Sequence, residues 1–301
     1  MPLHVVAFPA AGRTALASRR LTLYLPRMIL VSCRRNFTSD QFFSERNVAR
    51  DYHGTMADPF DELSDDELAE RADGTHVVVF VHGYRNPIKS VDTAYRQVAK
   101  TLTDRGLLAG PGGGPQTQYG LAVGFAWPGF RTRLLGFVAA RPSANRAGGH
   151  LRALVELLRH SARTVDVQTH SLGARVALQA LATGDSLWVD NLMLTAPAVD
   201  DECLLPTEEF HESLDSCNRA FVYHSQHDGV LKAYSVLAID RALGARGPEK
   251  KQLTLDECPN VYVVDCQSIV KGHSDYRKQA RYFDHWARVM NHAPLQRYEA
   301  V

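Results

Sequence analysis

Apolar runs alternate with amphipathic segments along most of this chain. The runs are short and bounded by turn residues, which indicates buried strands at residues 28–33, 75–81, 119–127, 163–170, 186–197, 217–225 and 259–266. Between them, apolar positions recur at helical spacing over residues 88–105, 145–162, 171–183, 230–243 and 274–291. Strands that alternate with helices in this way predict an α/β protein.

Several of the runs are apolar on both faces. In THVVVFV, at residues 75–81, no polar residue follows His76. A strand that is buried on both faces belongs in the interior of a parallel sheet that helices cover on each side. We therefore predict a doubly wound, mostly parallel sheet with right-handed crossovers.

Three segments interrupt the alternation. Residues 44–75 are polar and acidic, and they predict a connection with one short helix capped by Ser64. Residues 106–118 form a loop rich in glycine and proline. Residues 129–144 would overhang the carboxyl edge of the sheet, either as a lid that contacts the substrate or as a solvated loop. Their aromatic and basic residues include Phe130, Arg131, Arg133, Phe137 and Arg141.

No linker divides the chain after residue 28, so we expect one domain over residues 28–295. Residues 1–27 contain four arginines and no acidic residue. Their apolar part precedes most of the positive charge, which is the reverse of a secretory signal. We expect a disordered or non-native extension there, although a transit peptide is also compatible with the composition.

Composition narrows the class of function. The chain has 301 residues, 45% of them hydrophobic, and a formal net charge of +1, so nothing favours nucleic acid or an anionic membrane as a partner. No apolar stretch is long enough to span a bilayer. The five cysteines are scattered without CxxC spacing, which argues against disulfides and zinc. We expect a cytoplasmic protein that acts on a small molecule without a metal or cofactor; its oligomeric state stays open.

Chemically reactive side chains follow the predicted strands. In an open parallel sheet, ligands bind at the carboxyl ends of the strands, so these positions predict the functional site. The residues found there are His82, Gly83, Tyr84, Trp127, His170, Ser171, Asp228 and His273.

Ser171 has the sequence setting of a nucleophile. A nucleophilic serine projects from a sharp strand-to-helix turn that needs small flanking residues, which gives the pattern G-x-S-x-G. Here the pattern is Thr169-His170-Ser171-Leu172-Gly173, with threonine in place of the first glycine. The alternative is that Ser171 only caps a helix.

Two later residues favour the nucleophile. A catalytic serine needs an imidazole to accept its proton and a carboxylate to orient that imidazole. His273 and Asp228 provide them, and the chain order of serine, aspartate and histidine is that of α/β-hydrolases. The competing acids are Asp200 and Asp201, for which helix capping is favoured, and the competing bases are His227 and His285.

The remaining site residues follow from the needs of a tetrahedral intermediate. Its oxyanion requires backbone N–H donors, and we predict those of Leu172 and Tyr84. His82, Gly83 and Trp127 are the predicted substrate-binding residues, whereas His170 would shape the turn without a catalytic role.

These motifs resemble α/β-hydrolases, and more narrowly a bacterial α/β-hydrolase family catalogued as a domain of unknown function. The resemblance covers roughly residues 28–285. It implies the α/β-hydrolase fold and the triad, and it carries almost no information about the substrate. The segments that carry it are MILVSCRRN, VFVHGYRNPIKSVDTAYRQVA, FAWPG, THSLGARV, APAVDDE and HSQHDGVL.

The sequence thus predicts a serine hydrolase that cleaves carboxylic esters through an acyl-enzyme. Thioesters, lactones and amides remain open as substrates, and the same residues would serve an acyltransferase or a thioesterase. The alternative from another class is a non-catalytic α/β scaffold that binds a partner.

Overall fold

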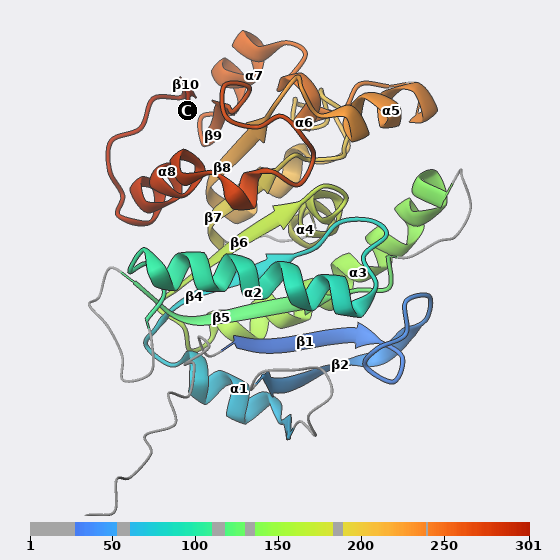
Figure 1. Ribbon diagram of the computed structural model, residues 1–301, viewed down its shortest axis with the longest axis vertical. Helices are drawn as coiled ribbons and strands as arrows, with labels where there is room; N and C mark the ends of the chain where they lie inside the picture. The colour runs from blue at the N-terminus through green and yellow to red at the C-terminus, as the bar shows by residue number, and fades with distance from the viewer. Residues whose placement is uncertain (1–27, 53–60, 110–117, 130–135, 183–188, 239) are drawn as a thin grey trace, which may run out of the picture.

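The structure is a computed structural model, and it describes residues 28–52, 61–109, 118–129, 136–182, 189–238 and 240–301. These residues form a central ten-stranded sheet with helices on both faces (Figure 1). The strands are β1 (Met28–Arg34), β2 (Phe43–Tyr52), β3 (Glu62–Leu63), β4 (His76–Val81), β5 (Tyr119–Ala126), β6 (Thr164–His170), β7 (Val189–Thr195), β8 (Cys217–His224), β9 (Val261–Asp265) and β10 (Tyr298–Ala300).

The sheet is mostly parallel, as the sequence predicts. Its strand order is β10-β9-β8-β7-β6-β4-β5-β1-β2-β3, and the pairings of β2 with β1 and with β3 are antiparallel. All pairings from β1 through β5, β4, β6, β7, β8 and β9 to β10 are parallel. The carboxyl ends of these strands therefore meet along one edge of the sheet.

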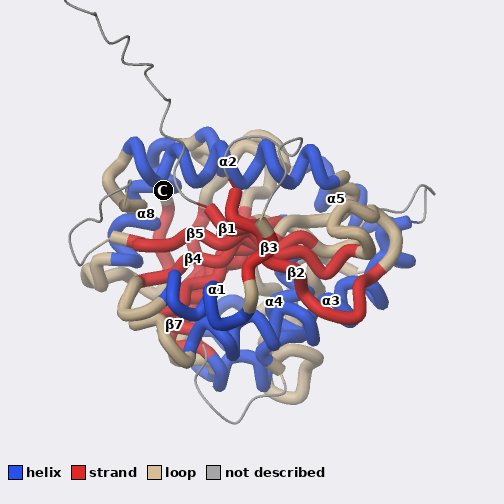
Figure 2. The backbone as a smooth tube through the Cα atoms, turned by 90° about the horizontal axis from the view of Figure 1, so that it is seen from below, coloured by secondary structure: helices blue, strands red, loops and turns tan. Residues whose placement is uncertain are grey.

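Helices cover the two faces of the sheet in separate groups. In the end-on view of Figure 2, α2, α5 and α8 lie on one face, and α1, α3 and α4 lie on the other. The helices are α1 (Asp65–Ala72), α2 (Ile88–Asp104), α3 (Gly136–Arg159), α4 (Gly173–Leu181), α5 (Gly229–Ala238), α6 (Leu243–Arg246), α7 (Lys251–Glu257) and α8 (Ala280–Met290), with 3-10 turns η1 (His211–Ser216) and η2 (Tyr276–Lys278).

Alternate side chains of the central strands enter two different cores. In β4, Val77 and Val79 pack with α1, α3 and α4, whereas Val78 and Phe80 pack with α2 and α8. All four side chains are fully buried. This two-sided burial confirms the reason for which a parallel sheet was predicted.

Three predictions about elements were wrong. Residues 43–52 form β2 rather than a polar connection, because an outer strand paired with buried β1 keeps polar side chains on its exposed positions. Residues 136–144 belong to α3, which includes Pro142, so the helix predicted from residue 145 starts earlier. β10 lies beyond the boundary expected at residue 295, and it pairs with β9.

Some predictions concern residues outside those that the structure describes. They are the extension at residues 1–27, most of the loop at 106–118, and residues 130–135 of the segment expected to overhang the site. The Ser64 cap of α1 is confirmed, with a reciprocal hydrogen bond from the Ser64 amide to Glu67. Across the described residues, the helices lack the combination of length and apolar character that a bilayer crossing requires.

All five cysteines lie in the interior with free thiols. Burial raises the pKa of each thiol, and it does so to about 12 for Cys33 and Cys217. These thiols therefore stay protonated and act as small apolar side chains.

A buried carboxyl group lies in the sheet away from its carboxyl edge. Asp166 of β6 accepts hydrogen bonds from the backbone and side-chain amides of Asn191 (3.1 and 2.8 Å) and from the hydroxyl of Tyr119 (2.5 Å). Trp286 of α8 donates in turn to the Tyr119 oxygen (3.0 Å). Burial raises the pKa of Asp166 to about 7, so folding takes up a proton there.

We expect this proton to make part of the stability pH-dependent. The unfolded carboxyl group has a pKa near ~4, so the protonated form stabilises the fold fully below that pH, and the contribution is lost as pH rises to about 7. Urea denaturation should show the stability of the wild type, relative to Asp166→Asn, falling by about 1 kcal/mol per pH unit over this window. A constant difference between the two proteins from pH 4 to 8 would contradict this expectation.

Candidate active site

Ser171 lies in a sharp turn between β6 and α4. Its backbone φ is +56°, in the left-handed region that non-glycine residues rarely adopt. Gly173 makes the turn possible, because a Cβ atom there would lie 2.5 Å from the Val81 carbonyl oxygen. Thr169, which replaces the first glycine of the pattern, is still in β6 and donates a hydrogen bond to the Met193 carbonyl of β7 (3.3 Å). The threonine is thus accommodated without loss of the turn.

Asp228 and His273 come together at the same edge of the sheet. Nδ1 of His273 donates a hydrogen bond to Oδ2 of Asp228 over 2.6 Å, and Asp228 is fully buried. The other carboxylate oxygen accepts from the backbone amides of Val230 and Leu231 (3.0 Å each) at the start of α5. These amides fix the carboxylate, which leaves Oδ2 to orient the imidazole ring.

The competing residues have other partners. Asp200 accepts hydrogen bonds from Arg141 (3.0 Å) and the Tyr234 hydroxyl (3.1 Å), and Asp201 pairs with Arg241. The segment from residue 201 to η1 consists of turns, so both aspartates form ion pairs instead of the expected helix caps.

The structure gives neither alternative histidine a side-chain hydrogen bond to Asp228 among the described residues. His285 is buried in α8, where it bonds to Tyr223 and Glu299, and His227 is exposed. Arg141, from the segment expected to overhang the site, is held by Asp200 and Tyr234.

His170 has a role that the sequence did not reveal. Its Nε2 lies 2.8 Å from the backbone carbonyl of His273, and a carbonyl only accepts, so Nε2 carries the proton. The two rings are 4.6 Å apart between centroids. Burial lowers the pKa of His170 to about 3, with a further contribution from His273, so the ring is neutral. It therefore fixes the backbone of His273 next to the turn that carries Ser171.

The hydroxyl of Ser171 forms no hydrogen bond with His273 or any other described residue at this geometry. Catalytic hydrogen bonds are often long in a free enzyme and shorten when substrate binds.

The loop after β4 lies against the turn that carries Ser171. A Cβ atom at Gly83 would lie 2.7 Å from Cβ and 3.3 Å from Oγ of Ser171, so glycine is needed here. The Gly83 carbonyl accepts from Nδ1 of His82 (2.8 Å) and from the side-chain amide of Asn86 (3.0 Å). Because N–H and C=O of a trans peptide point in opposite directions, the Tyr84 N–H is turned away from those two donors.

A buried network holds His82 in one protonation state. Its Nε2 accepts from the Trp127 amide (3.1 Å) and from Arg34 (3.2 Å), so Nδ1 carries the proton. Burial, reinforced by the charge of Arg34, lowers the pKa of His82 well below its usual value. The ring is therefore neutral and donates to Gly83.

Trp127 lies elsewhere than expected. It is fully buried, stacks on His82 with ring centroids 5.4 Å apart, and donates from its indole to the His82 carbonyl (2.8 Å). It therefore packs against His82 in the loop after β4, and it does not line the cavity described next.

Arg34, at the end of β1, is a second residue that sequence reasoning missed. It is fully buried, pairs with Asp40, and donates to the Asn86 carbonyl (2.9 Å) as well as to His82. Asp40 also accepts from the Ile88 amide at the start of α2 (3.2 Å). These contacts tie the ends of β1 and β4 to the first turn of α2. The only sequence signal was the basic pair after the first apolar run.

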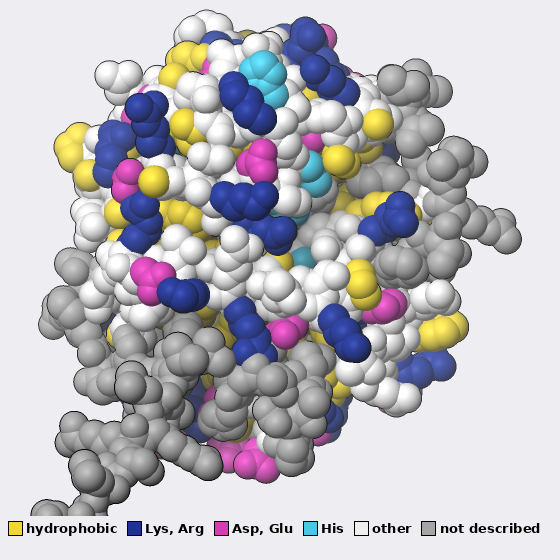
Figure 3. Space-filling model, viewed as in Figure 1, with side chains coloured by type: hydrophobic (Ala, Val, Ile, Leu, Met, Phe, Trp, Pro, Cys, Tyr) yellow, Lys and Arg dark blue, Asp and Glu magenta, His cyan; other side chains and the backbone are white. Residues whose placement is uncertain are grey.

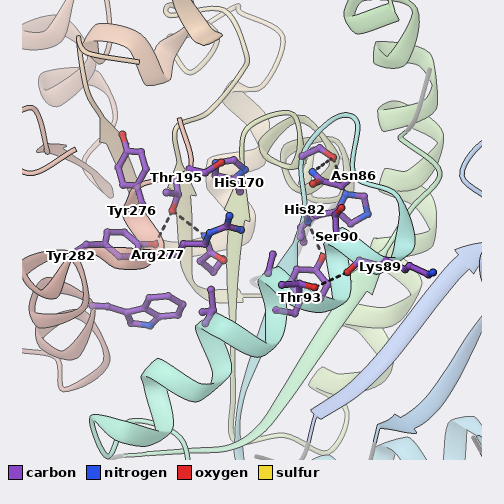
Figure 4. Close-up of a pocket in the computed structure, with 18 residues that line it drawn as sticks. His82, Asn86, Lys89, Ser90, Thr93, His170, Thr195, Tyr276, Arg277 and Tyr282 are labelled. Carbon is purple, nitrogen blue, oxygen red and sulfur yellow. Dashed lines mark hydrogen bonds between the residues drawn. The ribbon is translucent and has the colours of Figure 1, made fainter. Parts of the chain in front are cut away.

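A cavity of about 500 Å³ opens beside this site (Figure 4). His82, Gly83 and His170 line its end near Ser171, and it runs between α2 and α8. In the described part of the chain, no three His, Cys, Asp or Glu side chains are grouped so that they could hold a metal ion.

The mostly parallel sheet, the helices on both faces and the sharp turn between β6 and α4 define the α/β-hydrolase fold. The chain belongs to a family described as "Alpha/beta hydrolase of unknown function (DUF900)", which matches residues 61–285. This match confirms the resemblance drawn from the sequence motifs over residues 61–285, and it does not include the motif MILVSCRRN at residues 28–36. A comparison with curated proteins finds no match.

Solved structures with related folds include several esterases. Esterase PE8 is 13% identical, with 74% of this chain and 95% of that chain covered and a TM-score of 0.45. An esterase of Pyrococcus furiosus, Pf2001, is 12% identical, with 82% and 88% covered and a TM-score of 0.42. A dienelactone hydrolase from Klebsiella pneumoniae, itself described as putative, is 9% identical, with 87% and 97% covered and a TM-score of 0.46. At these TM-scores, none of them indicates a substrate or a catalytic residue.

The left-handed backbone of Ser171 predicts a stability difference between two variants that both lack the hydroxyl. Ser171→Gly removes the Cβ that makes this conformation unfavourable, whereas Ser171→Ala keeps it. In thermal or urea unfolding, the glycine variant should be more stable than the alanine variant by about 1 kcal/mol. An alanine variant of equal or greater stability would show that this backbone is not strained.

Proposed function

We propose that this protein is a serine hydrolase of carboxylic esters and that Ser171, His273 and Asp228 form its catalytic triad. The proposal is carried by one observation: the His273–Asp228 pair, the turn of Ser171 and the Gly83 loop all meet at one edge of the sheet. Acyl transfer to an acceptor other than water, and thioester hydrolysis, use the same residues.

In the proposed mechanism, Ser171 Oγ attacks the ester carbonyl while Nε2 of His273 accepts its proton. The Asp228 carboxylate holds Nδ1–H of His273 and stabilises the imidazolium that forms. His273 then protonates the departing alcohol, which leaves an acyl group on Ser171. A water molecule, deprotonated by His273, hydrolyses that acyl-enzyme in the second half of the reaction.

The backbone amides of Leu172 and Tyr84 would stabilise the oxyanion. Leu172 directly precedes α4, where the first N–H groups have no partner within the helix. The Tyr84 amide belongs to the peptide that His82 and Asn86 orient through its carbonyl. Such donors stabilise the transition state because they are fixed before charge develops.

The site geometry predicts which variants react with a fluorophosphonate probe, which labels activated serines. The wild type should be labelled, and Ser171→Ala should not. Asp228→Asn should be labelled at least about a hundredfold more slowly, because an amide no longer orients the imidazole correctly.

Asp200→Asn is the matched control, since Asp200 pairs with Arg141 outside the proposed triad and its loss should leave the labelling rate unchanged. Unlabelled wild-type protein near neutral pH would favour the non-catalytic scaffold. Slow labelling of Asp200→Asn with normal labelling of Asp228→Asn would identify Asp200, rather than Asp228, as the carboxylate of the triad.

Arg34 should act on turnover through the loop after β4. Arg34→Met removes one of two donors to His82 Nε2 and the bond to Asn86, so the Tyr84 amide loses part of its support. We expect kcat for a p-nitrophenyl ester to fall about tenfold to a hundredfold, with a much smaller change in KM.

Arg46→Met is the control for this variant, because Arg46 lies on an outer strand and its ion pair with Glu62 is exposed to solvent. A purely structural role for Arg34 would lower the thermal stability of the variant while leaving kcat per folded molecule intact.

We also propose that the protein works in a reducing compartment such as the cytoplasm. The support is that all five cysteines are free and buried.

A further inference from the structure

The cavity beside the proposed triad has walls from two opposite sides. Figure 4 shows Lys89, Ser90 and Thr93 of α2 on one side, and Tyr276, Arg277 and Tyr282 on the other. Gln168, His170 and Thr195 at the ends of β6 and β7 form its floor. Its volume of about 500 Å³ suits a substrate group of several carbon atoms.

The charged residues that line this cavity are all basic. Lys89 and Arg277 are among the residues that line it, and none of the lining residues is an aspartate or glutamate. His170 adds no charge near neutral pH, because burial keeps its ring neutral. In Figure 3, Lys and Arg side chains also gather around the middle of the face onto which α2 and α8 pack.

The positive charges have no carboxylate partner among the described residues. Within that part of the chain, Arg277 and Lys89 form no ion pair, and Nε of Arg277 is buried without a hydrogen bond. The acidic residues nearest to them in sequence are already paired, Asp92 with Arg96 and Asp275 with Lys278. A buried guanidinium nitrogen without a partner is unfavourable, and a carboxylate that accepts from the guanidinium would satisfy it.

The start of α2 adds to the positive electrostatic potential of the cavity. This helix begins at Ile88 with no acidic residue in its first turn, and its N-cap residue, Pro87, provides no side-chain hydrogen bond. The amino end of a helix carries partial positive charge, which favours an anion close by. Asp40, which accepts from the Ile88 amide, is neutralised by its ion pair with Arg34.

The cavity is also placed where part of a substrate would lie. Gly83 and His170, which touch or adjoin Ser171, line it, and so does Ser274, the residue after His273. A group bound by Arg277 would thus be connected to an ester carbonyl at Ser171 through a short chain.

We propose that this cavity binds a carboxylate carried by the substrate, so that the enzyme prefers esters of short acids or alcohols that end in a carboxylate group. This inference rests on the proposed hydrolase function for its kinetic consequences. Arg277 is the ligand of the carboxylate, since its planar guanidinium can donate two parallel hydrogen bonds.

The test compares two p-nitrophenyl esters of the same shape. One is the monoester of glutarate, with a free carboxylate, and in the other an isopropyl group replaces that carboxylate. The wild type should hydrolyse the charged ester with a kcat/KM about tenfold or more above that of the neutral one. Arg277→Met should abolish this preference by slowing only the charged ester. Lys89→Met should leave it nearly unchanged, because the Lys89 side chain points away from the cavity in Figure 4.

Arg281→Met is the matched control, because Arg281 lies four residues further along in the first turn of α8, is exposed, and does not line the cavity. It should leave both rates unchanged. Equal kcat/KM values for the two esters in the wild type, or a preference that survives Arg277→Met, would overturn the carboxylate site while the hydrolase proposal stands.

A binding measurement keeps this inference separate from catalysis. If neither ester is hydrolysed and the fluorophosphonate probe does not react, the proposed function fails. Calorimetric titration with methyl hydrogen glutarate then tests, independently of catalysis, whether the cavity binds a carboxylate. Binding to the wild type that is lost in Arg277→Met, but not in Arg281→Met, supports the site, and absence of binding to the wild type overturns it.

Discussion

The backbones at the ends of β4 and β6 approach so closely that a side chain would not fit at either of two positions. A Cβ atom at Gly173 would lie within 2.6 Å of two carbonyl oxygens from the β4 end, and one at Gly83 would collide with Ser171. This close approach sets the turn of Ser171 against the peptide that carries the Tyr84 amide. Because the strands are neighbours in the sheet, their pairing register fixes the distance between Ser171 and that amide before any substrate is present.

The sequence predicted the fold well where burial determines the pattern. The runs that became β4, β5 and β9 are apolar on both faces, and only an interior position in a sheet satisfies them. β2 was not predicted because its polar residues alternate only weakly with apolar ones. It is a strand because it pairs with the buried strand β1. The start of α3 was placed too late because Pro142 weakens the helical signal in its first turns.

The same contrast applies to the candidate site. Asp228 and His273 could be found because reactive side chains at strand ends, in a known chain order, are rare by chance. His170 and Arg34 could not, because they act through hydrogen bonds to backbone and to another ring, which depend on how β1, β4 and β6 are placed side by side. Trp127 was misjudged for a related reason: a position at a strand end does not reveal whether an aromatic ring faces the cavity or the core.

The burial of every native thiol has a practical consequence for studying this molecule in motion. None of the five cysteines offers a thiolate to a maleimide or iodoacetamide reagent, because each is protonated and enclosed in the core. A single cysteine introduced on the surface, for example in the exposed part of α8 or near the mouth of the cavity, would therefore carry a fluorophore or spin label without prior removal of the others. Movements of the loops around Ser171 could then be followed in a protein whose interior is unaltered.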